Sequence, residues 1–407
     1  LPLGRALRAL HTPGSMDEPE AGRRRLAFGE LLQLQIHMRS LARAAGRLRA
    51  RPCPEAALPP EEFAARLPFE LTASQREAIA ACSRAMAGER PMRKLLQGDV
   101  GSGKTVVAAF VGARAVLAGL QCAFLAPTRL LVDQHVRTLR SLLGPLGVEV
   151  EAIDGLMKRE ERQRLLERLR RGDPLFVVGT HALLDEAVVF GALGAAVIDE
   201  QHRFGVDQRR RLEEKGPSHQ LYMSATPIPR TLALALLGDL ECIDLKEKPP
   251  GRLPVDTRWI HPRDREKVYA FLLREVGRGR QAYVVFPRIG GDDEEGGAAG
   301  QAELLARTWL KGARVGLLHG RMSPSEQESV MRRFAAGEID VLVATTVVEV
   351  GIDVPRASVI VVEEADRFGL AQLHQLRGRV GRGGQGGYAL LISQARTEAA
   401  RQRLAAL

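Results

Sequence analysis

The sequence Gly98-Asp99-Val100-Gly101-Ser102-Gly103-Lys104-Thr105 places a glycine-rich loop between an apolar segment, Leu95 and Leu96, and a helical run from Val106 to Leu117. It fits the pattern G-x-x-x-x-G-K-[ST]. Glycine has no Cβ, so backbone N–H groups in such a loop can approach a phosphate chain closely, and the start of the helix adds the positive end of its dipole. A glycine-rich turn without a ligand is the alternative, but the flanking strand and helix favour a phosphate-binding loop.

The side chains of this loop have separate tasks if it holds a nucleoside triphosphate. Lys104 would reach the β and γ phosphates, and the Thr105 hydroxyl would hold Mg²⁺. The cradle around the phosphates would be formed by the backbone of Gly98, Gly101, Ser102 and Gly103. The loop therefore predicts a nucleoside triphosphate and Mg²⁺ as cofactors.

The second half of such a nucleotide site is a carboxylate at the end of a buried strand. The run Ala195-Ala-Val-Ile-Asp199-Glu200 supplies one, because a wholly apolar segment ends there in two acids. One acid would bind Mg²⁺ through water, and the other would polarise the attacking water. We assign Asp199 to the metal and Glu200 to the general base. A pair of surface acids is the alternative.

Far along the chain, Gln375-Leu-Arg-Gly-Arg379-Val-Gly-Arg382-Gly spaces arginines three residues apart among glycines. Arginines that reach a γ-phosphate across a cleft neutralise charge in the transition state of phosphoryl transfer. Such a string alone is also typical of an RNA-binding or solvated patch. Together with the upstream nucleotide motifs, it predicts that Arg379 and Arg382 are arginine fingers.

Short apolar runs alternate with amphipathic helical stretches on both sides of a Pro/Gly-rich break at residues 246–254. This alternation is typical of βαβ units around a parallel sheet. We expect an N-terminal helical segment at 1–64, a first domain at 65–248 and a second domain at 249–407. The predicted strands lie at 122–126, 175–178, 195–198, 221–223, 282–286, 315–318, 341–344 and 359–362.

Two further segments stand apart in composition. A helical stretch from Ala21 to Arg49 carries leucines at helical spacing and several arginines, so it either braces the first domain or touches DNA; we favour the brace. The tract from Gly290 to Gly300 mixes glycines with Asp and Glu and predicts an acidic loop without a catalytic role.

Composition is that of a globular protein of 407 residues, with 45% hydrophobic and 27% charged residues. At ~100 to 200 residues per domain this length predicts two or three domains. No apolar run approaches the ~18 to 20 residues of a membrane span, and the start is unlike a signal peptide, so we expect a soluble, cytoplasmic protein. Four scattered cysteines favour reduced thiols over a zinc site or disulfides.

The charge balance of 59 Lys+Arg against 49 Asp+Glu gives a net charge of +10. An excess of this size suggests a polyanionic partner, with nucleic acid as the first candidate, although an arginine-rich composition also arises from genome bias. Only 4% of the residues are aromatic, which leaves few rings for stacking single-stranded bases. Contacts to the backbone of duplex DNA are therefore favoured.

Four strings together resemble superfamily 2 helicases: Gln-Gly-Asp-Val-Gly-Ser-Gly-Lys-Thr (97–105), Asp-Glu-Gln-His-Arg-Phe-Gly-Val (199–206), Ser-Ala-Thr-Pro-Ile-Pro-Arg-Thr (224–231) and the segment 366–382. Among these helicases they are most similar to the RecG family of bacterial branched-DNA translocases, from about His11 onward. The transcription-repair coupling factors share much of the second-half signature. Their motif II usually reads D-E-E-Q, whereas this chain has Asp199-Glu200-Gln201-His202.

The resemblance implies two RecA-like helicase domains, ATP with Mg²⁺ as cofactors, and roles for further residues. On the nucleotide side it implies Phe69, Gln75, Gly351, Asp353 and Gln375, with Gln75 bonded to the adenine base. Coupling of hydrolysis to domain movement would involve His202, Ser224 and Thr226. Contacts to DNA would come from Thr128, Arg129, Thr180, His181, His319, Gly320 and Thr345, although Arg129 stands where the family pattern has an acid.

The implied activity is ATP-dependent translocation on branched DNA, with fork regression and Holliday junction migration in recombination and repair. The implied partners are forks, junctions, duplex arms and single-strand-binding protein, with a monomeric protein in the nucleoid. RecG proteins also carry a wedge domain before the motor and a hairpin after the last arginine motif, and this sequence shows neither. Three alternatives stay open: a coupling-factor-like translocase, an inert clamp that binds nucleotide and DNA, and an RNA helicase.

Overall fold

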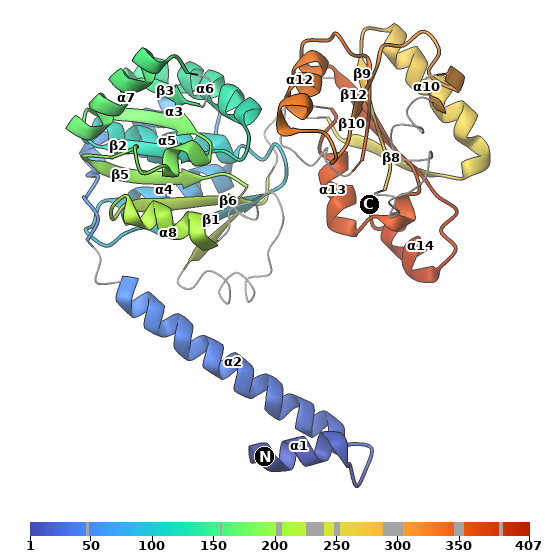
Figure 1. Ribbon diagram of the computed structural model, residues 1–407, viewed down its shortest axis with the longest axis horizontal. Helices are drawn as coiled ribbons and strands as arrows, with labels where there is room; N and C mark the ends of the chain where they lie inside the picture. Colours follow the sequence, from blue (N-terminus) through green and yellow to red (C-terminus); the bar gives the residue numbers. More distant parts are fainter. Residues whose placement is uncertain are drawn as a thin grey trace.

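The computed structural model describes residues 1–45, 49–154, 157–200, 206–224, 240–247, 253–287, 304–305, 307–345, 354–381 and 386–407. Two α/β domains lie beside each other, and a long helix extends away from the first of them (Figure 1). The predicted acidic loop at 290–300 and most of the predicted linker at 246–254 lie outside the described residues.

The first domain contains a seven-stranded parallel sheet in the order β3-β4-β2-β5-β6-β1-β7. Its central strands are buried on both faces, which explains why they read as uninterrupted apolar runs. The four strands predicted between 122 and 223 are confirmed as β2, β4, β5 and β6. The strands are β1 (Arg93–Gly98), β2 (Gln121–Leu125), β3 (Val150–Ile153), β4 (Leu175–Gly179), β5 (Leu193–Ile198), β6 (His219–Ser224) and β7 (Glu241–Leu245).

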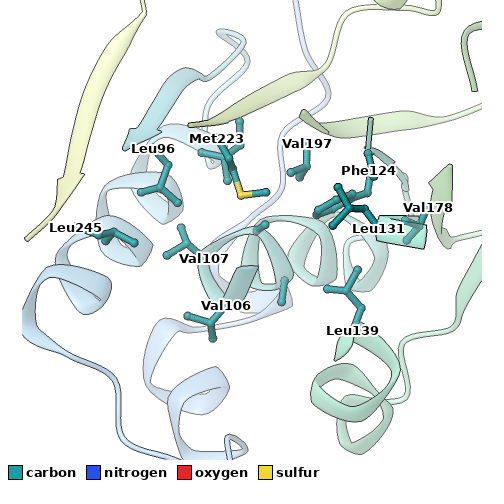
Figure 2. Close-up of a cluster of buried hydrophobic side chains, with 14 of the residues drawn as sticks. Leu96, Val106, Val107, Phe124, Leu131, Leu139, Val178, Val197, Met223 and Leu245 are labelled. Atoms are coloured by element: carbon teal, nitrogen blue, oxygen red, sulfur yellow. The ribbon is translucent and has the colours of Figure 1, made fainter. Parts of the chain in front are cut away.

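Helix α5 is the centre of this domain, since every residue from Val106 to Val116 is buried. It packs on the sheet close enough that a Cβ on Gly112 would lie 2.0 Å from the Phe176 ring, so only glycine fits there. Figure 2 shows the apolar side chains of this core, contributed by the sheet and by α5 and α6. The helices are α3 (Pro60–Ala65), α4 (Ala73–Met86), α5 (Lys104–Leu117), α6 (Arg129–Leu143), α7 (Arg159–Arg171) and α8 (Val206–Glu214), with short 3-10 turns η1 (Glu55–Ala57), η2 (Gly144–Leu146) and η3 (His181–Leu184).

The second domain contains a six-stranded parallel sheet in the order β10-β11-β9-β12-β13-β8. The four strands predicted between 282 and 362 are confirmed here. The strands are β8 (Val255–Ile260), β9 (Gln281–Val285), β10 (Val315–Leu318), β11 (Val341–Ala344), β12 (Ala357–Val362) and β13 (Gly387–Ile392). The helices are α10 (Arg265–Gly277), α12 (Pro324–Ala335), α13 (Leu370–Arg377) and α14 (Glu398–Ala405), with the turns η5 (Pro262–Asp264) and η7 (Ala365–Arg367).

The two sheets have the same strand order once β7 is left out. Strands β1 to β6 correspond in chain order to β8 to β13, and each occupies the same place in its sheet. The duplicated alternation of apolar runs in the sequence is therefore a duplicated fold, with two parallel-sheet α/β domains.

A buried glutamine repeats this correspondence at the level of single bonds. Gln121 begins β2, and its amide donates to the carbonyls of Leu169 (2.8 Å) and Asp173 (3.2 Å) at the end of α7. Gln281 begins β9, and its amide donates to the carbonyls of Phe334 (2.6 Å) and Ile339 (2.7 Å) at the end of α12. In each domain a glutamine at the start of one strand therefore holds the end of the helix that leads into the neighbouring strand.

The N-terminal helices differ from the predicted brace. Helix α1 (Leu3–His11) packs along α2 (Glu18–Ala45), and α2 runs away from the first domain (Figure 1). Phe28, Leu31 and Ile36 are largely exposed, because the direction of α2 carries its apolar residues out of reach of the sheet. Within the described residues, neither α2 nor any other helix has the length and hydropathy that a membrane span requires.

The segment from Ala50 to Ala65 is the part that braces the first domain. Ala50 and Cys53 donate backbone bonds to the carbonyls of Glu89 (2.7 Å) and Met86 (2.8 Å). The buried Arg114 of α5 donates its Nε to the Cys53 carbonyl at 3.0 Å. Burial raises the pKa of the Cys53 thiol to about 11, as expected for a reduced structural cysteine.

Candidate functional site

The glycine loop (residues 98–103) joins β1 to α5 at the carboxyl edge of the first sheet. Gly101 and Gly103 have φ values of +82° and +84°, a region that L side chains rarely adopt. A Cβ on Gly98 would lie 2.5 Å from the Ser102 hydroxyl oxygen and 3.0 Å from Leu245 Cβ, so a larger residue would displace these neighbours. Backbone conformation therefore favours glycine at two places in the predicted motif, and crowding favours it at a third.

The polar atoms of the glycine loop fit a phosphate chain. Lys104 is the first residue of α5, and its ammonium donates to the carbonyls of Gly98 (2.7 Å) and Asp99 (3.0 Å). The Ser102 hydroxyl is buried, and no hydrogen-bond partner for it occurs among the described residues. Thr105 follows Lys104 at the N-terminus of α5, where backbone N–H groups and the helix dipole favour an anion.

Gln75 lies beside the glycine loop rather than on the surface. It is 2% exposed, its Nε2 donates to the Ser102 carbonyl at 2.9 Å, and its Oε1 accepts from the Thr72 N–H at 2.9 Å. The second bond belongs to the capping box that starts α4. An amide has two N–H groups and two acceptor lone pairs, so these two bonds leave one of each; a contact of Gln75 with an adenine base stays a prediction. Phe69, which precedes this cap, is 47% exposed.

Asp199 directly follows β5, and each of its carboxylate oxygens accepts a hydrogen bond. The Oδ2 atom lies 2.9 Å from His135 Nε2, and Oδ1 accepts from the Glu200 N–H at 3.0 Å. Burial by itself would raise the pKa of Asp199, but the hydrogen bond from His135 and the charge of Lys104 outweigh it and hold the pKa below its usual range. Asp199 is therefore ionised at neutral pH.

Glu200 has a backbone conformation that is unusual for glutamate, with φ at +52°. Its counterpart in the second domain, Glu364, has φ at +46°. The preceding residues also correspond, because the Asp199 and Glu363 N–H groups both donate at 2.9 Å to the last carbonyl of the neighbouring central strand, Leu125 or Val285. The acidic turn is thus duplicated along with the fold.

The charge next to this turn differs between the domains. Glu363 is buried and accepts two hydrogen bonds from Arg265, at 3.0 and 2.9 Å, and one from the Tyr269 hydroxyl at 2.9 Å. Arg265 is the first residue of α10, as Lys104 is the first residue of α5. An arginine of the same domain therefore balances the charge of this carboxylate. The duplication of the acidic turn is visible in the sequence as Arg-Phe-Gly, which occurs at 203–205 and again at 367–369.

The arginine segment of the second domain meets the glycine loop of the first. A Cβ on Gly378 would lie 3.1 Å from Val100 Cβ, and Arg379 next to it is 3% exposed. Gln375 is half-buried on α13 of the same segment. Arg382 lies outside the described residues.

The residues expected at DNA lie at the carboxyl ends of adjacent strands. Thr128 caps α6 after β2, and Thr180 caps η3 after β4, where His181 is exposed. In the second domain His319 and Gly320 follow β10, and the buried Thr345 follows β11. Because β2 pairs with β4 and β10 with β11, each domain gathers its set at one part of its edge.

Arg129 begins α6, and acidic side chains surround its guanidinium. Its Nε lies 3.1 Å from Asp154 Oδ2 and 3.8 Å from Glu328 Oε1, the latter on α12 of the second domain. Burial raises the pKa of the neighbouring Asp133, and the charges of Asp154 and Glu328 add to this while Arg129 opposes it. A contact of Arg129 with DNA stays a prediction.

Ser224 ends β6, is fully buried and pairs in register with Gln97 of β1, next to the glycine loop. Its predicted coupling partners His202 and Thr226 lie outside the described residues, as do Gly351 and Asp353. His135 is the residue at this site that the sequence analysis missed. It lies 64 positions from Asp199, and no spacing in the sequence points to their contact.

The helicase family models match both domains. The model for DEAD/DEAH box helicases matches residues 72–234, and the model for the helicase conserved C-terminal domain matches residues 265–384. Within the described residues, no cluster of three or more His, Cys, Asp or Glu side chains forms a ready metal site.

The chain is similar to proteins named ATP-dependent DNA helicase RecG. It is 45% identical to that of Mycobacterium tuberculosis, over 97% of this chain and 57% of the relative, and 45% identical to that of Thermotoga maritima, over 97% and 51%. The chain thus spans about half the length of these curated relatives. A solved structure of RecG bound to a three-way DNA junction superimposes with a TM-score of 0.86 at 41% identity, covering 98% of this chain and 53% of the other. The chain belongs to the RecG family of helicases and corresponds to the part that contains the two helicase domains.

Proposed function

We propose that this chain is the ATP-hydrolysing motor of a RecG-type helicase that translocates on branched DNA. The observation that carries the proposal is the contact of Gly378, next to the buried Arg379, with Val100 of the glycine loop. A phosphate-binding loop in one domain and arginines in the other are the two halves of a nucleotide site between helicase domains.

Each half has a chemical task. Lys104 and the loop N–H groups bind the phosphates, and ionised Asp199 stands at the metal side. Glu200 follows it in a strained backbone conformation and acts as the general base on the attacking water. Arg379 and Arg382 neutralise the charge that develops on the γ-phosphate. Gln75 and Phe69 contact the adenine base of ATP, and Gln375, Gly351 and Asp353 are the further residues that we assign to nucleotide binding.

We further propose Mg²⁺ as the metal. Thr105 and Asp199 would hold it, because a hydroxyl and a carboxylate are the oxygen ligands that Mg²⁺ takes beside substrate phosphates. When bound, it would neutralise charge on the β and γ phosphates. The partly buried, ionised Asp199 and the orphan Ser102 hydroxyl fit such a charged ligand.

DNA is the proposed polyanion. The edge of the first sheet offers Thr128, Arg129, Thr180 and His181, the edge of the second offers His319, Gly320 and Thr345, and both suit backbone contacts. A RecG structure bound to a three-way DNA junction supports branched DNA as the substrate, and we propose forks, Holliday junctions and duplex arms as its forms. Ser224, His202 and Thr226 would link hydrolysis to domain movement. We also propose that the protein is a cytoplasmic, nucleoid-associated monomer that interacts with single-strand-binding protein.

Steady-state ATPase rates with forked duplex, linear duplex and single strand test this function. We expect stimulation by all DNA and the largest stimulation by the fork. Because Lys104 binds the phosphates, Lys104→Ala should lose nucleotide binding and hydrolysis together. Arg379→Ala should keep nucleotide binding and lose ~10³-fold or more in rate, the typical loss for one arginine finger.

The controls separate this proposal from its alternatives. Circular dichroism verifies that both variants are folded. An inert clamp would bind nucleotide and DNA but release no phosphate under any condition. Full turnover in Lys104→Ala would refute the assignment of the glycine loop, and stimulation by RNA alone would point to an RNA helicase.

A further inference from the structure

His135 connects helix α6 to the carboxylate at the end of β5. Its Nε2 lies 2.9 Å from Asp199 Oδ2, and because an ionised carboxylate can only accept, Nε2 is the donor. The ring is 6% exposed and packs obliquely on Phe124 of β2, with centroids 4.6 Å apart. Packing and the hydrogen bond together hold the ring in one place.

This contact fixes the orientation of the carboxylate. His135 donates to one oxygen of Asp199, and the Glu200 N–H donates to the other. Two donors on different oxygens oppose rotation, and each oxygen keeps a lone pair directed elsewhere. Donors that orient a metal-side carboxylate are worth ~10–100-fold in metal affinity or activity when they are lost.

The start of α6 faces the second domain. Thr128 caps the helix by accepting from the Leu131 N–H at 3.4 Å, and Arg129 in the first turn contacts Asp154 and, across the domains, Glu328. With ~3.6 residues per turn, Arg129 and His135 lie less than two turns apart. A shift of the start of α6 is therefore also a shift of the His135 ring.

We propose that His135 is a positioning residue that holds Asp199 in its metal-binding orientation and couples it to the contacts at the start of α6. The coupling part rests on the proposed function, which supplies DNA as what α6 meets beside the second domain. When Arg129 exchanges acidic partners for DNA phosphate, the helix moves the ring and resets the carboxylate. Since coupling free energies are reciprocal, a correctly held Asp199 also favours the DNA-bound position of α6.

A buried histidine that only fills the core would show different behaviour. Its replacement by an apolar residue of similar size would change the free energy of unfolding without changing metal dependence. A positioning residue changes the Mg²⁺ requirement and recovers when a side chain restores the donor. The test therefore compares three variants at this one position.

The measurement is binding of a fluorescent non-hydrolysable ATP analogue to the 407-residue chain, titrated with MgCl₂ with and without a three-way DNA junction. In His135→Leu the Mg²⁺ concentration for half-maximal binding should rise ~10–100-fold. His135→Gln places a donor near the position of Nε2 and should stay close to the parent. His135→Asn is as polar but too short, so it should behave like His135→Leu.

Junction DNA should lower the Mg²⁺ requirement of the parent and of His135→Gln, and have a much smaller effect in His135→Leu. Equal Mg²⁺ requirements in the parent and His135→Leu would overturn the positioning role. Equal requirements in His135→Gln and His135→Asn would overturn it as well, and this pair decides the matter if His135→Leu does not fold. A parent chain whose Mg²⁺ requirement ignores the junction would overturn the coupling.

Failure of the proposed function would look different. Binding of the analogue requires no hydrolysis, so the Mg²⁺ titrations are valid even if no DNA stimulates phosphate release. In that case the chain is not a DNA-dependent motor, while the comparison of the three variants still accepts or rejects His135.

Discussion

The two domains stabilise the charge of the equivalent carboxylates Asp199 and Glu363 in different ways. Asp199 is ionised and accepts a hydrogen bond from His135, whereas the charge of Glu363 is balanced by an ion pair with Arg265. Since both follow the same strand in the same fold, the fold alone does not make a nucleotide site. In the first domain the carboxylate accepts from His135 and is stabilised by the charge of Lys104, whereas in the second domain it forms an ion pair with Arg265.

His219 is a buried titratable residue outside this site. Its Nδ1 accepts from the Met92 N–H at 3.1 Å and its Nε2 donates to the Arg51 carbonyl at 3.1 Å, an arrangement that requires a neutral ring. Burial lowers the pKa of His219 from its ordinary value of 6.5, although the bond to Arg51 works in the opposite direction. The unfolded chain binds the proton first as the pH falls.

The free energy of unfolding should therefore fall as the pH drops below about 6.5, by at most about 1.4 kcal/mol per pH unit for this one group. Urea denaturation at about pH 8 and about pH 5.5 measures the effect. His219→Gln should lose less stability between these two values than the parent. The exposed His261 provides the matched control, His261→Gln, which should follow the parent. Identical pH dependence in all three proteins would contradict the prediction.

At the scale of elements, the buried amides of Gln121 and Gln281 tie helix ends to strands in the two domains. Gln121 also accepts from the Ala192 N–H at 3.0 Å, whereas Gln281 Oε1 has no partner among the described residues. Both domains thus use a buried glutamine amide at the point where a crossover helix returns to its parallel sheet. Gln121 makes three side-chain hydrogen bonds there and Gln281 makes two.

Replacement of either glutamine by methionine should destabilise its own domain. A buried polar group left without a partner costs about 1–3 kcal/mol, so Gln121→Met should cost more than Gln281→Met. The two tryptophans, Trp259 and Trp309, are both in the second half of the chain, so their fluorescence reports on that domain. Gln281→Met should shift the fluorescence transition in urea. Gln121→Met should shift the circular-dichroism transition and leave the fluorescence transition in place.

An equal shift of both signals in both variants would contradict this prediction, because it would mean that the domains unfold as one unit. A methionine at a surface glutamine, Gln394→Met, is the control for the substitution itself. Gln394 lies on the exposed turn after β13 and should leave both transitions unchanged.

At the scale of the whole molecule, the two domains meet both at the glycine loop and at the start of α6. Arg129 of the first domain lies 3.8 Å from Glu328 of α12, which also pairs with Arg332 at 2.8 Å. These side chains are partly exposed, so the pair adds little to stability, about 0–1 kcal/mol. Its effect should appear in DNA binding, because Glu328 holds negative charge next to an expected phosphate contact.

Glu328→Gln should bind DNA more tightly, by about two- to tenfold at constant salt, and should show a steeper dependence of affinity on salt. The matched control is Glu338→Gln, which changes the net charge equally but removes an ion pair with Arg333 at 3.3 Å, beyond the end of α12. Fluorescence anisotropy with a labelled three-way junction measures both affinities. Equal effects of the two substitutions would show that only net charge matters and that Arg129 does not contact DNA.

Short-range patterns were sufficient for much of this protein. The glycine loop, the acidic pair after β5, the arginine segment and the parallel-sheet strands were all predicted from the sequence, because backbone requirements and the burial of strands are local properties. The brace was wrong in its location: the helical stretch was recognised correctly, but the segment after it packs on the first domain. A helical pattern identifies an apolar face and not the surface that covers it.

Contacts between distant residues had to come from the folded chain. His135 reaches Asp199 because β2 and β5 are neighbours in the sheet, and Val100 meets Gly378 because the two domains contact each other there. The sequence by itself determined which residues have the types and the near spacing from which we predict phosphate and metal binding. Strand order and domain contact decided which of them meet, since tertiary packing alone brings together side chains far apart along the chain.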